Sequence, residues 1–159
     1  MKEILKYSCL IFLYALSHSY LATCFAIDLK IKGYEERYIG LSLSFWGIGV
    51  ILGALLHNLI RKKLNLFSTI LYGSIIQLSF SLIFLIDQNT FLVALMQFVM
   101  GITSAINSLT LESHISSKFK KTSGFYISLF WSSAGLGAIT GSLFLSLIHI
   151  SEPTRPSQI

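Results

Sequence analysis

Five long apolar stretches constrain this chain more than any other feature of its sequence. They cover residues 8–27, 39–60, 67–86, 91–111 and 125–145. Each has close to the ~20 residues that an α-helix needs to cross a bilayer. Lipid offers no hydrogen-bond partners to the backbone, so a spanning segment must pair its own amides and carbonyls, which a helix does. The pattern predicts an all-α membrane protein in which short connections make consecutive transmembrane helices antiparallel.

The composition supports this class and argues against a nucleic-acid partner. Hydrophobic residues make up 53% of the 159 and charged residues 12%, whereas a soluble domain has about a quarter charged residues. The formal net charge is +5. Outside the N-terminus its main sources are two short clusters, Arg61-Lys62-Lys63 and Lys118-Lys120-Lys121. Such clusters are typical of membrane-protein loops, so we expect a lipid bilayer and no nucleic acid as partner.

The basic residues alternate between the two sides of the predicted bundle. Lys2 and Lys6 precede the first apolar stretch, the two basic clusters follow the second and fourth, and the charges of residues 28–37 sum to zero. The positive-inside rule therefore predicts a cytoplasmic N-terminus. Nine lysines against three arginines, with abundant isoleucine, hint at an AT-rich bacterial genome. We expect a multi-pass protein of the bacterial inner membrane.

Motifs of catalytic and metal chemistry are missing from the sequence. Cys9 and Cys24 lie on one predicted helix, about 22 Å apart along its axis, which is beyond disulfide reach. We find no metal-ligand spacing, no phosphate-binding glycine loop and no nucleophile elbow. The sequence therefore predicts neither an enzyme nor a metal site nor a cofactor.

Small residues recur at helical spacing in the second and fifth apolar stretches. Gly49 and Gly53 share one ridge, Gly40, Ser44 and Gly47 share another, and the fifth stretch carries Ser133, Gly137 and Gly141. Such ridges let helix backbones approach closely in lipid. Glycine is also common in membrane helices in general, so helix packing is one of two interpretations of the pattern.

Two of these stretches carry the resemblance to a known family. "YIGLSLSFWGIGVILGALLHNLIRKKL" resembles the second helix and the following loop of the major facilitator superfamily. Gly53, Leu55, Arg61 and Lys62 match the family's Gly-x-Leu-Ala-Asp-Arg-x-Gly-Arg-Lys motif, and His57 takes the place of its Asp.

Later stretches extend the resemblance. "MQFVMGITSAINSLTLES" resembles the family's fourth helix, with Gln97 at the position of an Arg and Gly101 matching, and "SAGLGAITGS" is similar to its fifth-helix glycine motif. The resemblance covers residues 1–144. It implies the first five helices of a twelve-helix fold built from two six-helix halves.

The end of the chain resembles something other than a protein. Translated in frame, a common transposase-type sequencing adapter gives Leu-Ser-Leu-Ile-His-Ile-Ser-Glu-Pro-Thr-Arg, which matches residues 145–155 without a mismatch. An index of three codons followed by resumed adapter accounts for the remaining four residues. We therefore expect genuine sequence to stop near Phe144, with 145–159 derived from the adapter and excluded from functional reasoning. The alternative is a natural loop after the fifth helix.

The fourth stretch offers the most informative candidate site. At 100° per residue, a polar stripe falls within about 80° of arc, opposite Val99, Ile102 and Ile106. Asn107 flanks this stripe, which consists of Gln97, Gly101, Ser104, Ser108 and Glu112. It predicts a face on a water-filled pathway or on a neighbouring helix. Glu112 is either a proton carrier or an ion-pair partner of Lys118 or a loop base.

The first stretch contributes a second candidate. His18 lies near mid-span in "YALSHSY", and Tyr14 shares its face. A histidine at this depth tends to face the protein interior, and its ordinary pKa near neutrality suits proton coupling. The alternative is a neutral imidazole that donates to a nearby backbone carbonyl. The resemblance adds that first and fourth helices line the family's central cavity.

Together these observations predict the N-terminal part of a secondary transporter. The complete protein would move a small solute by alternating access. The expected partners are the bilayer, a small-molecule substrate and the C-terminal half of the same protein. If transport is proton-coupled, protons are a further partner. A different class stays open: a small polytopic scaffold, assembly factor or sensor without transport activity.

Overall fold

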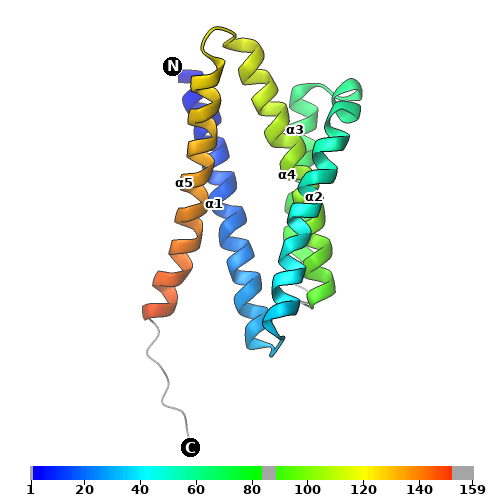
Figure 1. Cartoon of the computed structure of the whole chain (residues 1–159), viewed down its shortest axis with the longest axis vertical. Helices are drawn as coiled ribbons and strands as arrows, with labels where there is room; N and C mark the ends of the chain where they lie inside the picture. Colours follow the sequence, from blue (N-terminus) through cyan, green and yellow to red (C-terminus); the bar gives the residue numbers. More distant parts are fainter. Residues whose placement is uncertain (1, 84–88, 152–159) are drawn as a thin grey trace, which may run out of the picture. The chain divides into compact units, whose positions relative to one another are not determined.

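A computed structural model describes the backbone of residues 2–83 and 89–151 (Figure 1). Side chains are described for residues 3–82 and 89–144. This part of the chain is all helical. Its helices are α1 (Lys2–Ile31), α2 (Glu36–Lys63), α3 (Leu66–Ile83), α4 (Thr90–Lys118) and α5 (Ser123–Ser151). The predicted helical class is thus confirmed, with one helix for each apolar stretch.

Four of the described helices, α1, α2, α4 and α5, are long and apolar enough to cross a membrane, which indicates a membrane location. The apolar part of α3 that the structure describes, Leu66–Leu82, is shorter than the other four. The predicted third span, 67–86, runs into residues outside the described part of the chain. Four of the five predicted spans therefore correspond to helices that are long and apolar enough to cross a membrane.

α1, α2 and α4 are longer than the predicted apolar stretches because their polar ends are also helical. A Schellman motif ends α1: Tyr34 N–H donates to the Leu29 carbonyl at 3.1 Å and Gly33 N–H to the Lys30 carbonyl at 3.0 Å. Gly33 has φ +83°, a left-handed conformation that favours glycine. At the start of α4, the Asn89 side chain accepts from Leu92 N–H at 2.8 Å and caps the helix.

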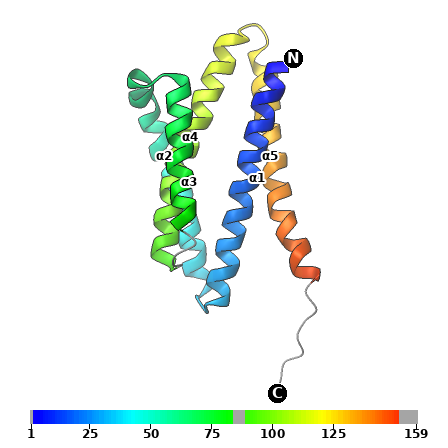
Figure 2. The same ribbon diagram turned by 180° about the vertical axis from the view of Figure 1, so that it is seen from behind.

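The chain divides into two compact units. The first combines α1 as far as Cys24 with α5 from Leu129 onward. Here α1 and α5 run side by side in both views (Figures 1 and 2). A Cβ on Gly137 would collide with the Phe12 carbonyl oxygen, and one on Gly141 with that of Leu16. Gly137 and Gly141 therefore lie where α5 comes close to the α1 backbone.

The second unit, Phe25–Ser128, holds α2, α3 and α4. α4 packs against both α2 and α3, while α2 and α3 make few contacts with each other. A Cβ on Gly49 would meet the Phe98 carbonyl oxygen, and one on Gly53 would come within 2.9 Å of the Ala105 Cβ. The Gly49–Gly53 ridge therefore packs on α4. The ridge through Gly40 and Gly47 does not, because a Cβ at either position would meet nothing within 4 Å.

The helix α5 does not end at Phe144, where we expected genuine sequence to stop. Its backbone continues through Ser151. This agrees with the apolar character of residues 145–150, which favours helix whatever their origin. Residues 152–159 lie outside the described part of the chain.

Candidate functional site

Buried polar side chains concentrate on α4. Of the nine buried polar side chains among the described residues, six belong to this helix: Gln97, Thr103, Ser104, Asn107, Ser108 and Thr110. These side chains are buried because α4 packs on both α2 and α3. Burying polar atoms costs free energy unless they find partners, so such a concentration indicates a site or a specific helix contact.

The predicted stripe of α4 divides between two environments. Gln97 is 1% exposed, and Ser104 and Ser108 are buried beside it on the same face by helical spacing. Gly101, in contrast, packs against α2, where a Cβ on it would lie 3.0 Å from the Cα of Gly49. Glu112, at the last member of the stripe, is half-buried. The stripe therefore contains one helix-packing residue and three buried polar side chains.

The amide of Asn107 faces α3. A Cβ on Gly73 of α3 would lie 2.5 Å from Asn107 Oδ1 and 2.8 Å from its Nδ2, so a side chain at this position would make the amide move. Asn107 was predicted to flank a pathway, and it forms part of the α3–α4 contact. That prediction remains untested, because a side chain can serve both purposes.

Sequence reasoning missed two threonines on the same side of α4. Thr103 and Thr110 lie at positions i−4 and i+3 from Asn107, and both are buried. The Thr103 hydroxyl lies 3.1 Å from the carbonyls of both Val99 and Met100 of its own helix, so its donor is used locally. The spacing Thr-x3-Asn-x2-Thr in the sequence is the signal that could have identified this ridge.

Three buried polar atoms of α4 have no hydrogen-bond partner among the described residues. They are Gln97 Oε1, Asn107 Oδ1 and Thr110 Oγ1. Buried acceptors are nearly always satisfied in folded proteins. This helix can therefore still accept hydrogen bonds from a solute, from water or from another part of a longer protein.

In the first unit, the predicted pair on α1 is brought together. The rings of Tyr14 and His18 are stacked, with 6.5 Å between centroids and 3° between planes, and both side chains are half-buried. Nearby on α1, the Ser19 and Ser142 hydroxyls hydrogen-bond at 2.7 Å and tie α1 to α5.

The residues of the predicted loop motif play distinct parts. Gly49 and Gly53 pack on α4, while Leu55 is exposed. Arg61 donates to the Leu64 carbonyl at 3.2 Å and so helps to end α2. Lys62 is exposed. The glycines thus serve helix packing and the two bases occupy the end of the helix.

A separate groove of about 250 Å³ opens between the first turns of α2 and α4. Aromatic side chains dominate its walls: Tyr38, Phe45 and Phe91. None of the predicted site residues lines it. Within the described residues, no group of three or more His, Cys, Asp or Glu side chains is placed to hold a metal ion.

Comparison with known proteins adds no assignment. The chain matches no protein-family model, no curated protein and no solved structure.

Proposed function

We propose that this chain is the N-terminal part of a secondary transporter of the major facilitator type. It sits in the bacterial inner membrane with its N-terminus in the cytoplasm, and the complete protein moves a small solute by alternating access. One observation supports the proposal most: a helix of spanning length carries six buried polar side chains, and three of these have an oxygen that no described residue hydrogen-bonds. Polar groups at membrane depth are costly and usually mark a solute or ion path.

The roles follow from the chemistry of these side chains. Gln97, Ser104 and Ser108 offer neutral donors and acceptors to a polar solute. Glu112 and His18 are the titratable groups proposed for proton coupling. No covalent step is involved, so the chain is not proposed as an enzyme, and the chemistry needs no cofactor.

Cysteine accessibility along α4 tests the pathway directly. In the complete transporter with Cys9 and Cys24 replaced by serine, Ser104→Cys and Ser108→Cys should react with a small hydrophilic thiol reagent. Val99→Cys, on the opposite side of the helix, is the matched control and should stay unreactive. If the protein works by alternating access, the labelling rates should also change when it is trapped open to one side of the membrane.

The alternative, a scaffold, assembly factor or sensor, makes a different prediction for the same variants. In such a protein the polar face of α4 would be sealed by other helices. Neither Ser104→Cys nor Ser108→Cys would then react faster than Val99→Cys, and the transport proposal would be rejected.

The genomic locus tests the proposal that more of the protein follows. Sequencing across the locus should show an open reading frame whose translation differs from the present sequence after about Phe144. It should continue into a sixth apolar stretch. Genomic DNA that encodes Glu152-Pro153-Thr154 in place would contradict this.

A further inference from the structure

The two ends of the second unit differ sharply in how their charges are used. At the end formed by the α1–α2 connection, three ion pairs neutralise the charged side chains. Lys30 Nζ lies 2.7 Å from Glu36 Oε1, Lys32 Nζ 3.1 Å from Asp28 Oδ2, and Arg37 Nε 2.7 Å from Glu35 Oε2. This end therefore presents no net charge.

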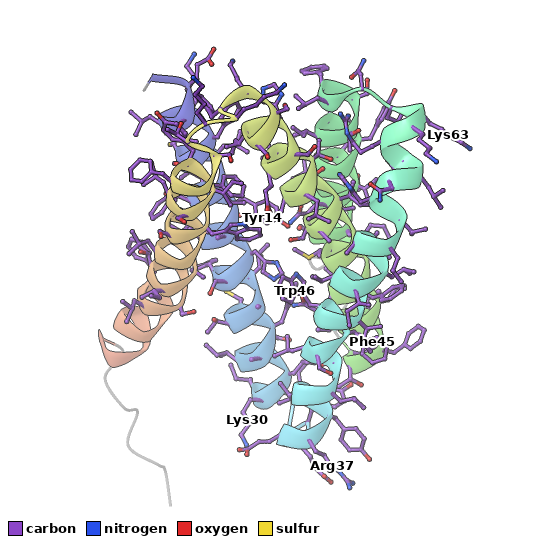
Figure 3. The ribbon with its side chains drawn as sticks, turned by 45° about the horizontal axis from the view of Figure 1, so that its top comes forward. Tyr14, Lys30, Arg37, Phe45, Trp46 and Lys63 are labelled. Carbon is purple, nitrogen blue, oxygen red and sulfur yellow. The ribbon has the colours of Figure 1, made fainter. Side chains whose placement is uncertain are left out.

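The opposite end presents basic side chains. α2 and α4 run in the same direction and pack together through Gly49, Gly53 and Gly101, so their C-termini lie at one end of the unit (Figure 1). Figure 3 shows Lys63 at this end of α2 and Arg37 at the other. The exposed lysines here are Lys62, Lys63, Lys118, Lys120 and Lys121, which we call the basic end.

Four lysines of the basic end, Lys62, Lys63, Lys120 and Lys121, have no ion-pair partner among the described residues. The helix dipole accounts for only part of this gathering of charge. Lys62 and Lys63 lie in the last turn of α2, where a cation is favourable. Lys120 and Lys121 follow Phe119, the C-cap residue of α4, and are therefore beyond the last turn.

The length of α2 and α4 places these lysines at the level of lipid headgroups. α2 has 28 residues and α4 has 29, so each spans about 42 Å or slightly more at 1.5 Å per residue. The hydrocarbon core of a bilayer is about 30 Å thick. In a membrane-spanning orientation, the last turns of both helices reach the phosphate layer.

From the parallel packing of α2 and α4, the exposed lysines and the helix lengths, we infer that the basic end binds the phosphate groups of anionic phospholipids. The lysine ammoniums act as point charges that attract these phosphates. The inference needs the membrane location only and does not depend on a transport activity.

Lipid selectivity of the purified full-length chain tests the inference. The chain is placed in nanodiscs, and electron paramagnetic resonance measures how much spin-labelled phosphatidylglycerol and spin-labelled phosphatidylcholine it immobilises. Both leaflets have the same composition, so the readout does not depend on the orientation that the bases impose in cells. The wild-type chain should prefer phosphatidylglycerol, and the preference should weaken as salt is added.

Two variants remove pairs of lysines from the basic end: Lys62→Gln with Lys63→Gln, and Lys120→Gln with Lys121→Gln. Each should lower the preference by up to about fivefold per lysine at low salt. The matched control removes two lysines from the neutral end without changing its net charge. It combines Lys30→Gln with Glu36→Gln and Lys32→Gln with Asp28→Asn, and should leave the preference unchanged.

Two outcomes would overturn the inference. One is a wild-type chain that immobilises both lipids equally. The other is an equal loss of preference in the control and in the basic-end variants, because the lipid preference would then depend on lysines at either end of the unit and not on the basic end. Circular dichroism of each variant shows that the helices are retained.

Discussion

At the scale of single residues, glycines decide which helix faces meet. Gly49 and Gly47 lie two positions apart on α2, yet only Gly49 touches α4. At Gly49 a methyl group would run into the Phe98 carbonyl, a backbone atom that cannot move away by itself. This pair of glycines therefore gives a direct test of the α2–α4 contact.

We expect Gly49→Ala to destabilise the protein by about 1–3 kcal/mol, the usual cost of overpacking. Gly47→Ala should be neutral or slightly stabilising, because alanine favours helix by up to about 1 kcal/mol over glycine. Unfolding in detergent followed by circular dichroism measures both. Equal stability of the two variants would show that α2 does not pack on α4 through Gly49.

A second residue-scale prediction concerns Glu112, the one acidic candidate of the α4 stripe. In the complete transporter, Glu112→Gln should abolish proton-driven accumulation and spare solute exchange. The neutral amide resembles the protonated acid in size and charge but cannot release a proton. Accumulation and exchange in membrane vesicles measure the two activities separately.

His18→Gln serves as the comparison for Glu112 and should impair accumulation less. If Glu112→Gln leaves the proton-coupled rate unchanged, Glu112 is an ion-pair residue. His18 would then be the remaining titratable candidate on these helices, and the search for the coupling site would move to the rest of the protein.

At the scale of elements, α1 and α5 form a pair held by small residues. Gly137 and Gly141 admit the α1 backbone, and the Ser19 and Ser142 hydroxyls lie 2.7 Å apart beside them. Such a contact depends on van der Waals packing and hydrogen bonds, since lipid provides no hydrophobic drive between helices.

This pairing predicts a cross-link. In a chain with Cys9 and Cys24 replaced by serine, Ser19→Cys with Ser142→Cys should form a disulfide under mild oxidation, because side chains in hydrogen-bond contact bring their Cβ atoms close. Ser17→Cys with Ser142→Cys is the control, since the Ser17 hydroxyl bonds to the Tyr14 carbonyl of its own helix. Mass spectrometry of peptides detects the link. A link in the control alone would place another face of α1 on α5.

At the scale of the whole molecule, the alternation of charge predicts orientation. The connection that carries Lys32 is neutral overall, whereas Lys120 belongs to the basic end. The positive-inside rule places Lys32 outside the cell and Lys120 inside. This placement is independent of any solute.

Single cysteines at these two exposed positions test the orientation in intact cells. On a background without Cys9 and Cys24, an impermeant thiol reagent should label Lys32→Cys and leave Lys120→Cys unlabelled until the membrane is opened. Equal labelling of both before the membrane is opened would contradict the proposed cytoplasmic N-terminus.

The sequence by itself determined the helical class, the position of each helix and the polar character of α4. Long apolar runs are a local property, and the lack of backbone partners in lipid applies to each run separately, so helices can be predicted without a partner segment. It also identified Tyr14 with His18 as neighbours, because residues four apart share a helix face.

Only the tertiary structure decided which faces meet. Periodicity gives the direction of a side chain around its own helix but not the helix that will lie there. The ridges through Gly49 and through Gly47 were therefore equivalent in the sequence, and Asn107 had no predicted partner. The close approach of α4 to α2 and of Gly73 to Asn107 separates these cases, because backbone contact in lipid requires two surfaces whose shapes fit.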